Sequence, residues 1–141
     1  MTHTEHWEEI SELAQRAGSA RESFVPPEDP PDEGRAMEFL RDGVGPAIVV
    51  YVDARTGDDW TRFPPVEHSL LERALNDFLE LYARCYGYEV DCEFAVREAA
   101  EALLETNNVK DTAQVLTRVP PREEMPEAWT AADSRNEGQW G

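Results

Sequence analysis

Three aspartates follow the most apolar stretch of the chain closely enough to act together on a metal ion. Asp53 comes directly after the apolar run 46–52, and Asp58 and Asp59 come next. If the run forms a strand, Asp53 lies at its carboxyl end and the other two lie on the adjacent loop. Carboxylate oxygens so placed could hold Mg²⁺ for phosphoryl transfer. A Mg²⁺-dependent phosphoryl-transfer enzyme that uses Asp53 is therefore one of three functional hypotheses.

The residues around Asp53 also carry a short resemblance. Residues 50–56, Val-Tyr-Val-Asp-Ala-Arg-Thr, resemble the start of haloacid-dehalogenase-type phosphatases, in which a hydrophobic strand leads into an aspartate. The resemblance implies phosphatase chemistry at Asp53, although Arg55 stands at the second acidic position of that motif. Asp-rich turns are also common wherever a hairpin turns in water. We therefore expect no catalytic residue, no metal ion and no cofactor, and we favour a function without catalysis.

A second pattern is typical of a helix-turn-helix. Predicted helices at 92–106 and 109–118 are separated only by Asn107 and Asn108, which suit a tight turn. In that motif the second helix enters the major groove of DNA. The second helix offers four polar or basic side chains for such contacts: Lys110, Gln114, Thr117 and Arg118. A DNA-binding regulator that uses the hairpin 92–118 is the second hypothesis.

The same hairpin has a plainer interpretation. Its first helix carries glutamates that would repel DNA phosphates, namely Glu93, Glu98, Glu101 and Glu105. An ordinary helical hairpin packed on a longer helix explains the pattern without DNA. In either case we expect Asn108 to cap the second helix, with Asp111 completing the capping pair.

The two cysteines are poor candidates for a metal site. Cys85 and Cys92 form no CxxC motif and have no histidine at ligand spacing. A disulfide between them could staple the turn between two helices, but a reducing cytoplasm disfavours it. We expect two buried thiols at a corner between helices.

Three tryptophans are candidate anchors for a protein partner. Trp7 begins a predicted amphipathic helix at 1–18, which needs a surface for its apolar stripe. Trp129 and Trp140 lie in the acidic segment 120–141, which otherwise holds few large apolar side chains. An aromatic residue in such a segment can fill a partner's groove. The alternative is that the segment folds back and lays Trp129 on the domain.

These residues must be positioned by a small single domain of the α+β class. The most regular pattern is a helix over 66–85, with Pro65 in its first turn and Gly87 after its end. Residues 47–52 and 60–63 predict the strands of a β-hairpin, and Gly43 with Gly45-Pro46 predicts the end of a short helix before it. We expect the hairpin to be covered by about three helices. The divisions are an N-terminal helix at 1–18, a Pro-rich acidic linker at 19–35, the core at 36–119 and an acidic tail at 120–141.

The charge of the chain reports its surroundings. Thirty acidic residues stand against thirteen basic ones, the net charge is -17, and Lys110 is the only lysine. Such a composition resembles the proteomes of salt-in halophiles, in which dense counter-ions screen the repulsion, although a GC-rich genome also favours arginine over lysine. No apolar run approaches the 18 to 20 residues or so that span a bilayer, and no secretory signal is evident.

Together these observations favour a non-enzymatic interaction or regulatory protein of a halophilic cytoplasm. We expect it to act through helical surfaces and flanking segments. The expected partner is another protein or a second copy of the chain; DNA is the alternative, and no membrane is expected.

Overall fold

A long helix, α4 (Pro65–Cys85), is the centre of the fold. The computed structural model describes residues 6–56 and 64–120, and within them α4 contacts every other α-helix. Its buried side chains recur at helical spacing and include Leu71, Leu75, Phe78, Leu79 and Tyr82. The helix predicted at 66–85 is therefore confirmed. It ends as expected, because Gly87 follows with a φ of 90°, a conformation that glycine adopts without strain.

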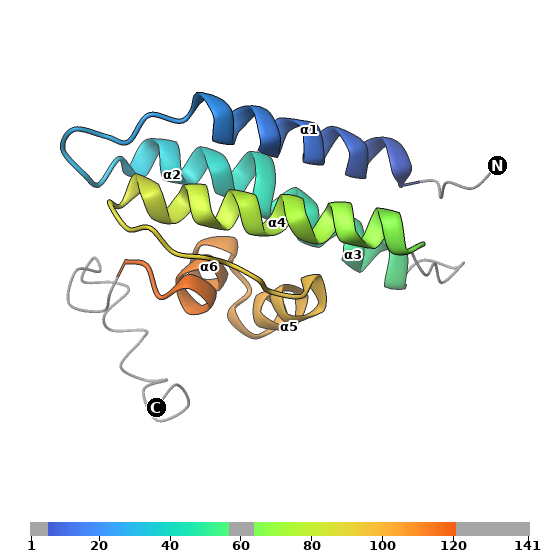
Figure 1. Cartoon of the computed structure of the whole chain (residues 1–141). Coiled ribbons are helices and arrows are strands. Elements are labelled where there is room, and N and C mark those ends of the chain that lie inside the picture. Colours follow the sequence, from blue (N-terminus) through green and yellow to red (C-terminus); the bar gives the residue numbers. More distant parts are fainter. Residues whose placement is uncertain (1–5, 57–63, 121–141) are drawn as a thin grey trace.

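Two further helical rods lie beside α4 (Figure 1). The first is α1 (Trp7–Ser23). The second is continuous from α2 (Glu33–Phe39) through the π-helical turn η1 (Leu40–Val44) into α3 (Gly45–Thr56). After α4 the chain turns back along it, and α5 (Val96–Thr106) and α6 (Val109–Thr117) form a hairpin on the far side of that segment from α1.

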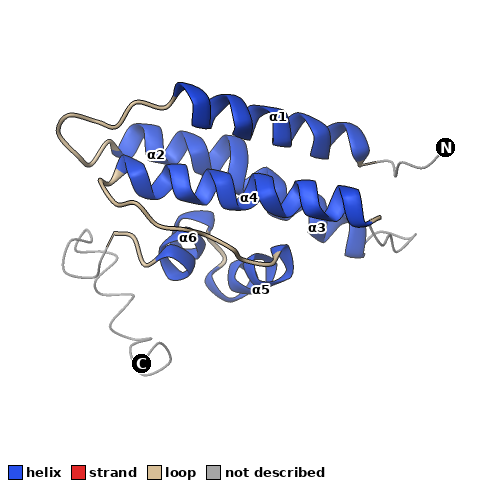
Figure 2. Cartoon of the chain, in the orientation of Figure 1, coloured by secondary structure: helices blue, strands red, loops and turns tan. Residues whose placement is uncertain are grey.

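The predicted α+β class and its β-hairpin are wrong. Every regular element of the described residues is helical (Figure 2), and residues 47–52 form the middle of α3. The second predicted strand, 60–63, lies outside the described residues. A short continuous apolar run does not distinguish a buried strand from a buried helix. Here Ala47, Ile48, Tyr51 and Ala54 are buried at helical spacing, and this burial outweighs the modest cost of β-branched residues in a helix.

The predicted break at Gly45-Pro46 is also wrong, because the helix passes through it. The amide of Gly45 donates to the carbonyl of Leu40, five residues back, which is the π-helical pattern. Pro46 then occupies the first turn of α3, where its missing N–H costs little. The wider turn thus lets one rod continue where an α-helix would stop.

The first helix runs past Gly18 to Ser23, so its predicted end was five residues too early. A glycine inside a helix costs about 1 kcal/mol relative to alanine, and packing of Ile10, Leu13 and Ala17 in the core offsets that cost. The connection from α1 to α2 is tied to α4, because the amide of Asp32 donates to the carbonyl of Cys85 at 2.8 Å.

The predicted start of the helix near residue 92 gives way to an extended segment. The amide of Phe94 donates to Oδ1 of Asn76, and the carbonyl of Phe94 accepts from Nδ2 of the same side chain. Both hydrogen bonds hold the backbone extended along α4, so α5 begins only at Val96. In the part of the chain that the structure describes, no helix has the length and apolar character needed to cross a bilayer.

Candidate interaction groove

A groove of about 690 Å³ lies where the rod formed by α2, η1 and α3 meets the start of α6. We call it the α3–α6 groove. Its described lining consists of Glu9, Met37, Leu40, Arg41, Gly45, Pro46, Val49, Asn108, Val109 and Lys110. The lining comes from α1, α2, η1, α3 and the first residues of α6, so five separate elements form one concavity.

The start of α6 lies close to the π-helical turn at the groove. A β-carbon at Gly45 would lie 3.1 Å from the carbonyl oxygen of Leu40 and 3.6 Å from Cγ2 of Val109. The tighter of the two distances is to the rod's own backbone, and the second shows that Val109, at the start of α6, lies beside Gly45. Turns of this kind within helices are frequent at functional sites.

The floor of the groove is apolar and its rim is charged. Val49 keeps 50% of its surface exposed although the neighbouring positions of α3 are buried. Arg41 is held at the rim by Asp42, with Nε to Oδ1 and Nη2 to Oδ2 distances of 3.0 Å each. These hydrogen bonds hold the pKa of the Asp42 carboxyl below its usual value. Lys110, at the start of α6, also lines the groove.

The position of Lys110 is fixed by the capping of α6. Oδ1 of Asn108 accepts from the amide of Asp111 at 3.1 Å, so the predicted cap is confirmed. Asn107 before it has a φ of 59°, the left-handed conformation that the sequence predicts for this turn. The groove offers an apolar surface beside two cations and one carboxylate, and its described lining includes no serine, threonine, cysteine or histidine. This chemistry suits binding.

A family model described as a domain of unknown function, DUF8055, matches residues 4–121. The chain belongs to this family. The matched range contains all the described helices and the whole described lining of the groove, and it leaves out residues 122–141. No curated protein and no solved structure matches the chain.

Within the DUF8055 domain the four candidate DNA-binding residues are divided between the two ends of α6. Lys110 lines the groove at the beginning of the helix. At the other end, Nε2 of Gln114 donates to the carbonyl of Pro120, and Oγ1 of Thr117 donates to the carbonyl of Ala113. Arg118 is exposed and ends the helix with a φ of 61°. The structure thus uses Gln114 and Thr117 within the chain itself.

The aspartates considered for Mg²⁺ lose the strand on which that arrangement depends. Asp53 is exposed on the helix α3, and Asp58 and Asp59 lie outside the described residues. Residues 6–56 and 64–120 contain no group of three or more His, Cys, Asp or Glu side chains that could hold a metal ion. The short phosphatase resemblance therefore has no strand behind it.

Both cysteines of the DUF8055 domain are buried thiols, as the sequence predicts. Both belong to the hydrophobic core, which also holds Tyr82 and Tyr86, whose ring centroids are 5.3 Å apart. Burial raises the pKa of the Cys85 thiol to about 11 and that of Cys92 to about 12. These thiols are protonated at neutral pH, so they are unsuited to nucleophilic or metal-binding roles.

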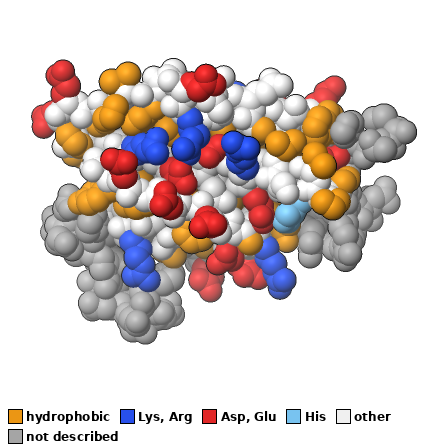
Figure 3. Space-filling model, viewed as in Figure 1, with side chains coloured by type: hydrophobic (Ala, Val, Ile, Leu, Met, Phe, Trp, Pro, Cys, Tyr) orange, Lys and Arg blue, Asp and Glu red, His pale blue; other side chains and the backbone are white. Residues whose placement is uncertain are grey.

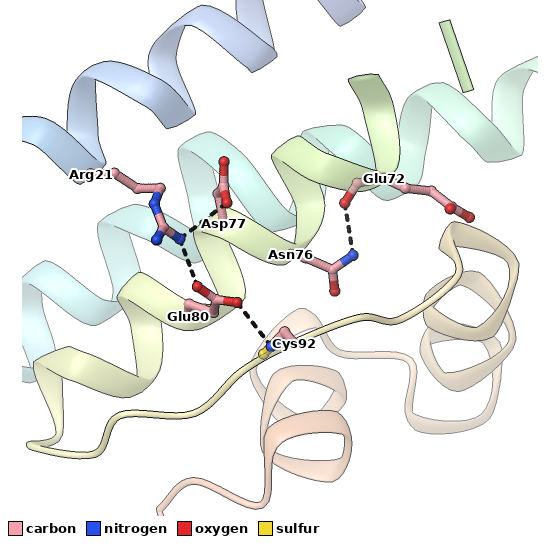
Figure 4. Close-up of polar contacts among 6 residues, drawn as sticks. All are labelled: Arg21, Glu72, Asn76, Asp77, Glu80 and Cys92. Atoms are coloured by element: carbon pink, nitrogen blue, oxygen red, sulfur yellow. Dashed lines mark hydrogen bonds and ion pairs between the residues drawn. The ribbon is translucent and has the colours of Figure 1, made fainter. Parts of the chain in front are cut away.

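A polar network on α4 was missed by sequence reasoning. Figure 4 shows Arg21 reaching from α1 to Asp77 and Glu80, while Glu80 reaches the backbone of the extended segment. Nη1 of Arg21 lies 3.1 Å from Oδ1 of Asp77 and 2.6 Å from Oε1 of Glu80, and Oε2 of Glu80 accepts from the amide of Cys92 at 2.9 Å. The network joins α1, α4 and the extended segment, which gives it a structural role.

Basic side chains gather along the seam between α1 and α4, with acidic side chains beside them (Figure 3). Arg21 and Arg73 line a hollow there of about 340 Å³, together with Asp77 and Glu22. Burial raises the pKa of the Asp77 carboxyl, and the charge of Arg21 opposes that rise. Its charges are matched within the chain, and its volume is about half that of the α3–α6 groove, so this seam is a weaker candidate for ligand binding.

The three candidate partner-binding tryptophans are only partly placed. Trp7 begins α1 and is partly buried. Trp129 and Trp140 lie outside the described residues.

Proposed function

We propose that this protein is a non-enzymatic interaction protein of a halophilic cytoplasm, and that it binds another protein in the α3–α6 groove. The observation that carries the proposal is the groove itself. Its floor exposes Val49 to solvent, and its rim holds two of the chain's thirteen basic residues, Arg41 and Lys110. An open apolar surface bordered by charge is typical of a protein-binding site.

The partner that this groove fits is an acidic chain with an apolar anchor. Because its net charge is -17, this protein repels acidic partners over most of its surface. In molar salt the Debye length falls to about 3 Å, so charged groups steer only at close range. Buried apolar area, which contributes about 25 cal/mol per Å², then supplies most of the affinity. A groove that combines an apolar floor with Arg41 and Lys110 meets both requirements.

The DNA-binding alternative has weaker support. Its two bases, Lys110 and Arg118, lie at opposite ends of α6. Between them, the side chains of Gln114 and Thr117 donate to backbone carbonyls of this same chain. The neighbouring helix α5 exposes Glu98, Glu101 and Glu105, which would repel phosphates. We therefore retain a protein as the proposed partner.

Replacing Val49 with glutamate is expected to abolish partner binding while leaving the fold intact. Val49 is 50% exposed, so a charged side chain can reach water in the free protein, whereas a bound partner would have to bury it. We expect at least a tenfold loss, about 1.4 kcal/mol or more. Affinity capture from native extract kept at high KCl, with quantitation by mass spectrometry, measures the effect.

Leu104→Glu is the matched control, because Leu104 is also an exposed apolar helix residue, at 73%, and lies outside the groove. Both variants should melt within a few degrees of the unmodified protein. The proposal requires a captured protein that the Leu104 variant retains and the Val49 variant loses. Equal capture by both variants would contradict it.

A further inference from the structure

The chain leaves the described fold close to the groove, at a fixed point. The hydroxyl of Tyr82 donates to the carbonyl of Val119 at 2.8 Å, and Nε2 of Gln114 donates to the carbonyl of Pro120 at 3.3 Å. Both hydrogen bonds hold residues 119 and 120 beside the carboxyl end of α6. The groove lies at the amino end of the same helix.

The segment that follows is long enough to reach the groove. The nine residues of α6 extend over about 14 Å, at about 1.5 Å per residue. The nine residues from Pro121 to Trp129 can span up to about 30 Å when extended. A tether of this length also keeps Trp129 at a local concentration on the order of millimolar, so a weak contact suffices.

The chemistry of residues 121–132 matches the partner chemistry that the groove calls for. The segment carries three glutamates and one arginine, and Met125 and Trp129 are its large apolar side chains. A tryptophan ring buries a large apolar area on a floor such as that around Val49. The lining of the groove includes the bases Arg41 and Lys110.

We infer that residues 121–132 of this chain occupy the α3–α6 groove in cis, with Trp129 on its floor, when no partner is bound. The inference rests on the proposed function of the groove. The segment then competes with the partner, because both need the same apolar floor. Binding of the partner must displace it, which lowers the apparent affinity by the fraction of chains with an open groove.

Photo-crosslinking of the full chain tests this occupancy. A chain with Trp129→p-benzoylphenylalanine, purified without partner and irradiated at high KCl, should form crosslinks within one chain. Mass spectrometry should map them to residues that line the groove, such as Met37. Adding Val49→Glu should reduce these crosslinks at least fivefold, whereas adding Leu104→Glu should leave them unchanged.

Two results would overturn the inference. Crosslinks that join two chains at the groove would assign the groove to a second copy, and crosslinks confined to other surfaces, or none at all, would show that the segment does not lie there. Either result leaves the proposed function standing if Val49→Glu still loses the captured partner. Conversely, intramolecular crosslinks at the groove, together with equal capture by the Val49 and Leu104 variants, would remove the proposed function and leave the contact in cis.

Discussion

Replacing Gly43 with alanine is expected to destabilise the protein by about 3 kcal/mol, the upper part of the range for an overpacked core. A β-carbon at Gly43 would lie 2.3 Å from Cγ of Phe78 and 2.5 Å from both of its Cδ atoms. Phe78 is only 3% exposed and packs against Phe39, with ring centroids 6.3 Å apart. These atoms belong to the root of the ring and not to the far end of a flexible side chain, so either the rod or α4 must shift.

Gly18→Ala is the matched control for this prediction. Gly18 also lies inside a helix, but a β-carbon there would meet nothing within 4 Å. It should therefore stabilise the protein by about 0.5 to 1 kcal/mol, through the entropy of the unfolded chain. Urea unfolding at one fixed KCl concentration measures both variants. Midpoints that coincide for Gly43→Ala and the unmodified protein would show that the rod does not pack on Phe78 as described.

Raising the pH above 9 is expected to unfold the protein steeply. Burial raises the pKa of Cys85 to about 11 and those of Cys92 and Tyr86 to about 12, and it raises the pKa of Tyr82 as well. Free thiols titrate near 9.0 and free tyrosines near 10.0. Between these values and the raised ones, the unfolded chain has lost protons that the folded chain keeps. Stability therefore falls as pH rises, by about 1.4 kcal/mol per pH unit for each such group.

Circular dichroism between pH 8 and about 12, with tyrosinate absorbance recorded in parallel, measures this loss. Helix content should fall together with the appearance of tyrosinate, because Tyr82 and Tyr86 are buried in the core and reach their ordinary pKa only when it opens. The double variant Cys85→Ala and Cys92→Ala should have a shallower decline between about pH 9 and 10, where only the thiols contribute. Tyrosine and thiol titration at ordinary pKa values, with helix content unchanged, would show that these tyrosines and thiols are not buried.

The sequence predicts the elements whose signals are local. The helix at 66–85 has a long apolar stripe, a proline in its first turn and a glycine after its end, and all three agree. Asn108 likewise caps α6 through its own short side chain. Such signals need no knowledge of the rest of the fold.

The errors arise where tertiary packing decides. Residues 47–52 resemble a buried strand in sequence, and only their burial among α4, α5 and η1 makes them a helix. The Gly45-Pro46 pair normally stops a helix, but a π-helical turn that brings Gly43 against Phe78 and Gly45 against Val109 carries the rod through. Neither contact can be derived from neighbouring residues.

The candidate groove was beyond sequence reasoning for the same reason. Val49 and Val109 are sixty residues apart in the chain, and they share a surface only because α6 begins against the rod. Lys110 was correctly singled out as unusual, yet it was assigned to DNA contacts on the basis of the hairpin pattern alone. An exposed valine within an apolar run becomes informative only once the helix and its buried face are known.

The most direct test of the proposed docking surface uses the only lysine of the chain. Carbodiimide coupling of the captured complex at high KCl joins amines to carboxylates that are in direct contact, and Lys110 carries the only side-chain amine of this protein. If an acidic partner docks in the α3–α6 groove, mass spectrometry will find its aspartate or glutamate peptides joined to Lys110. A complex that survives capture but yields no partner peptide on Lys110 would contradict the account.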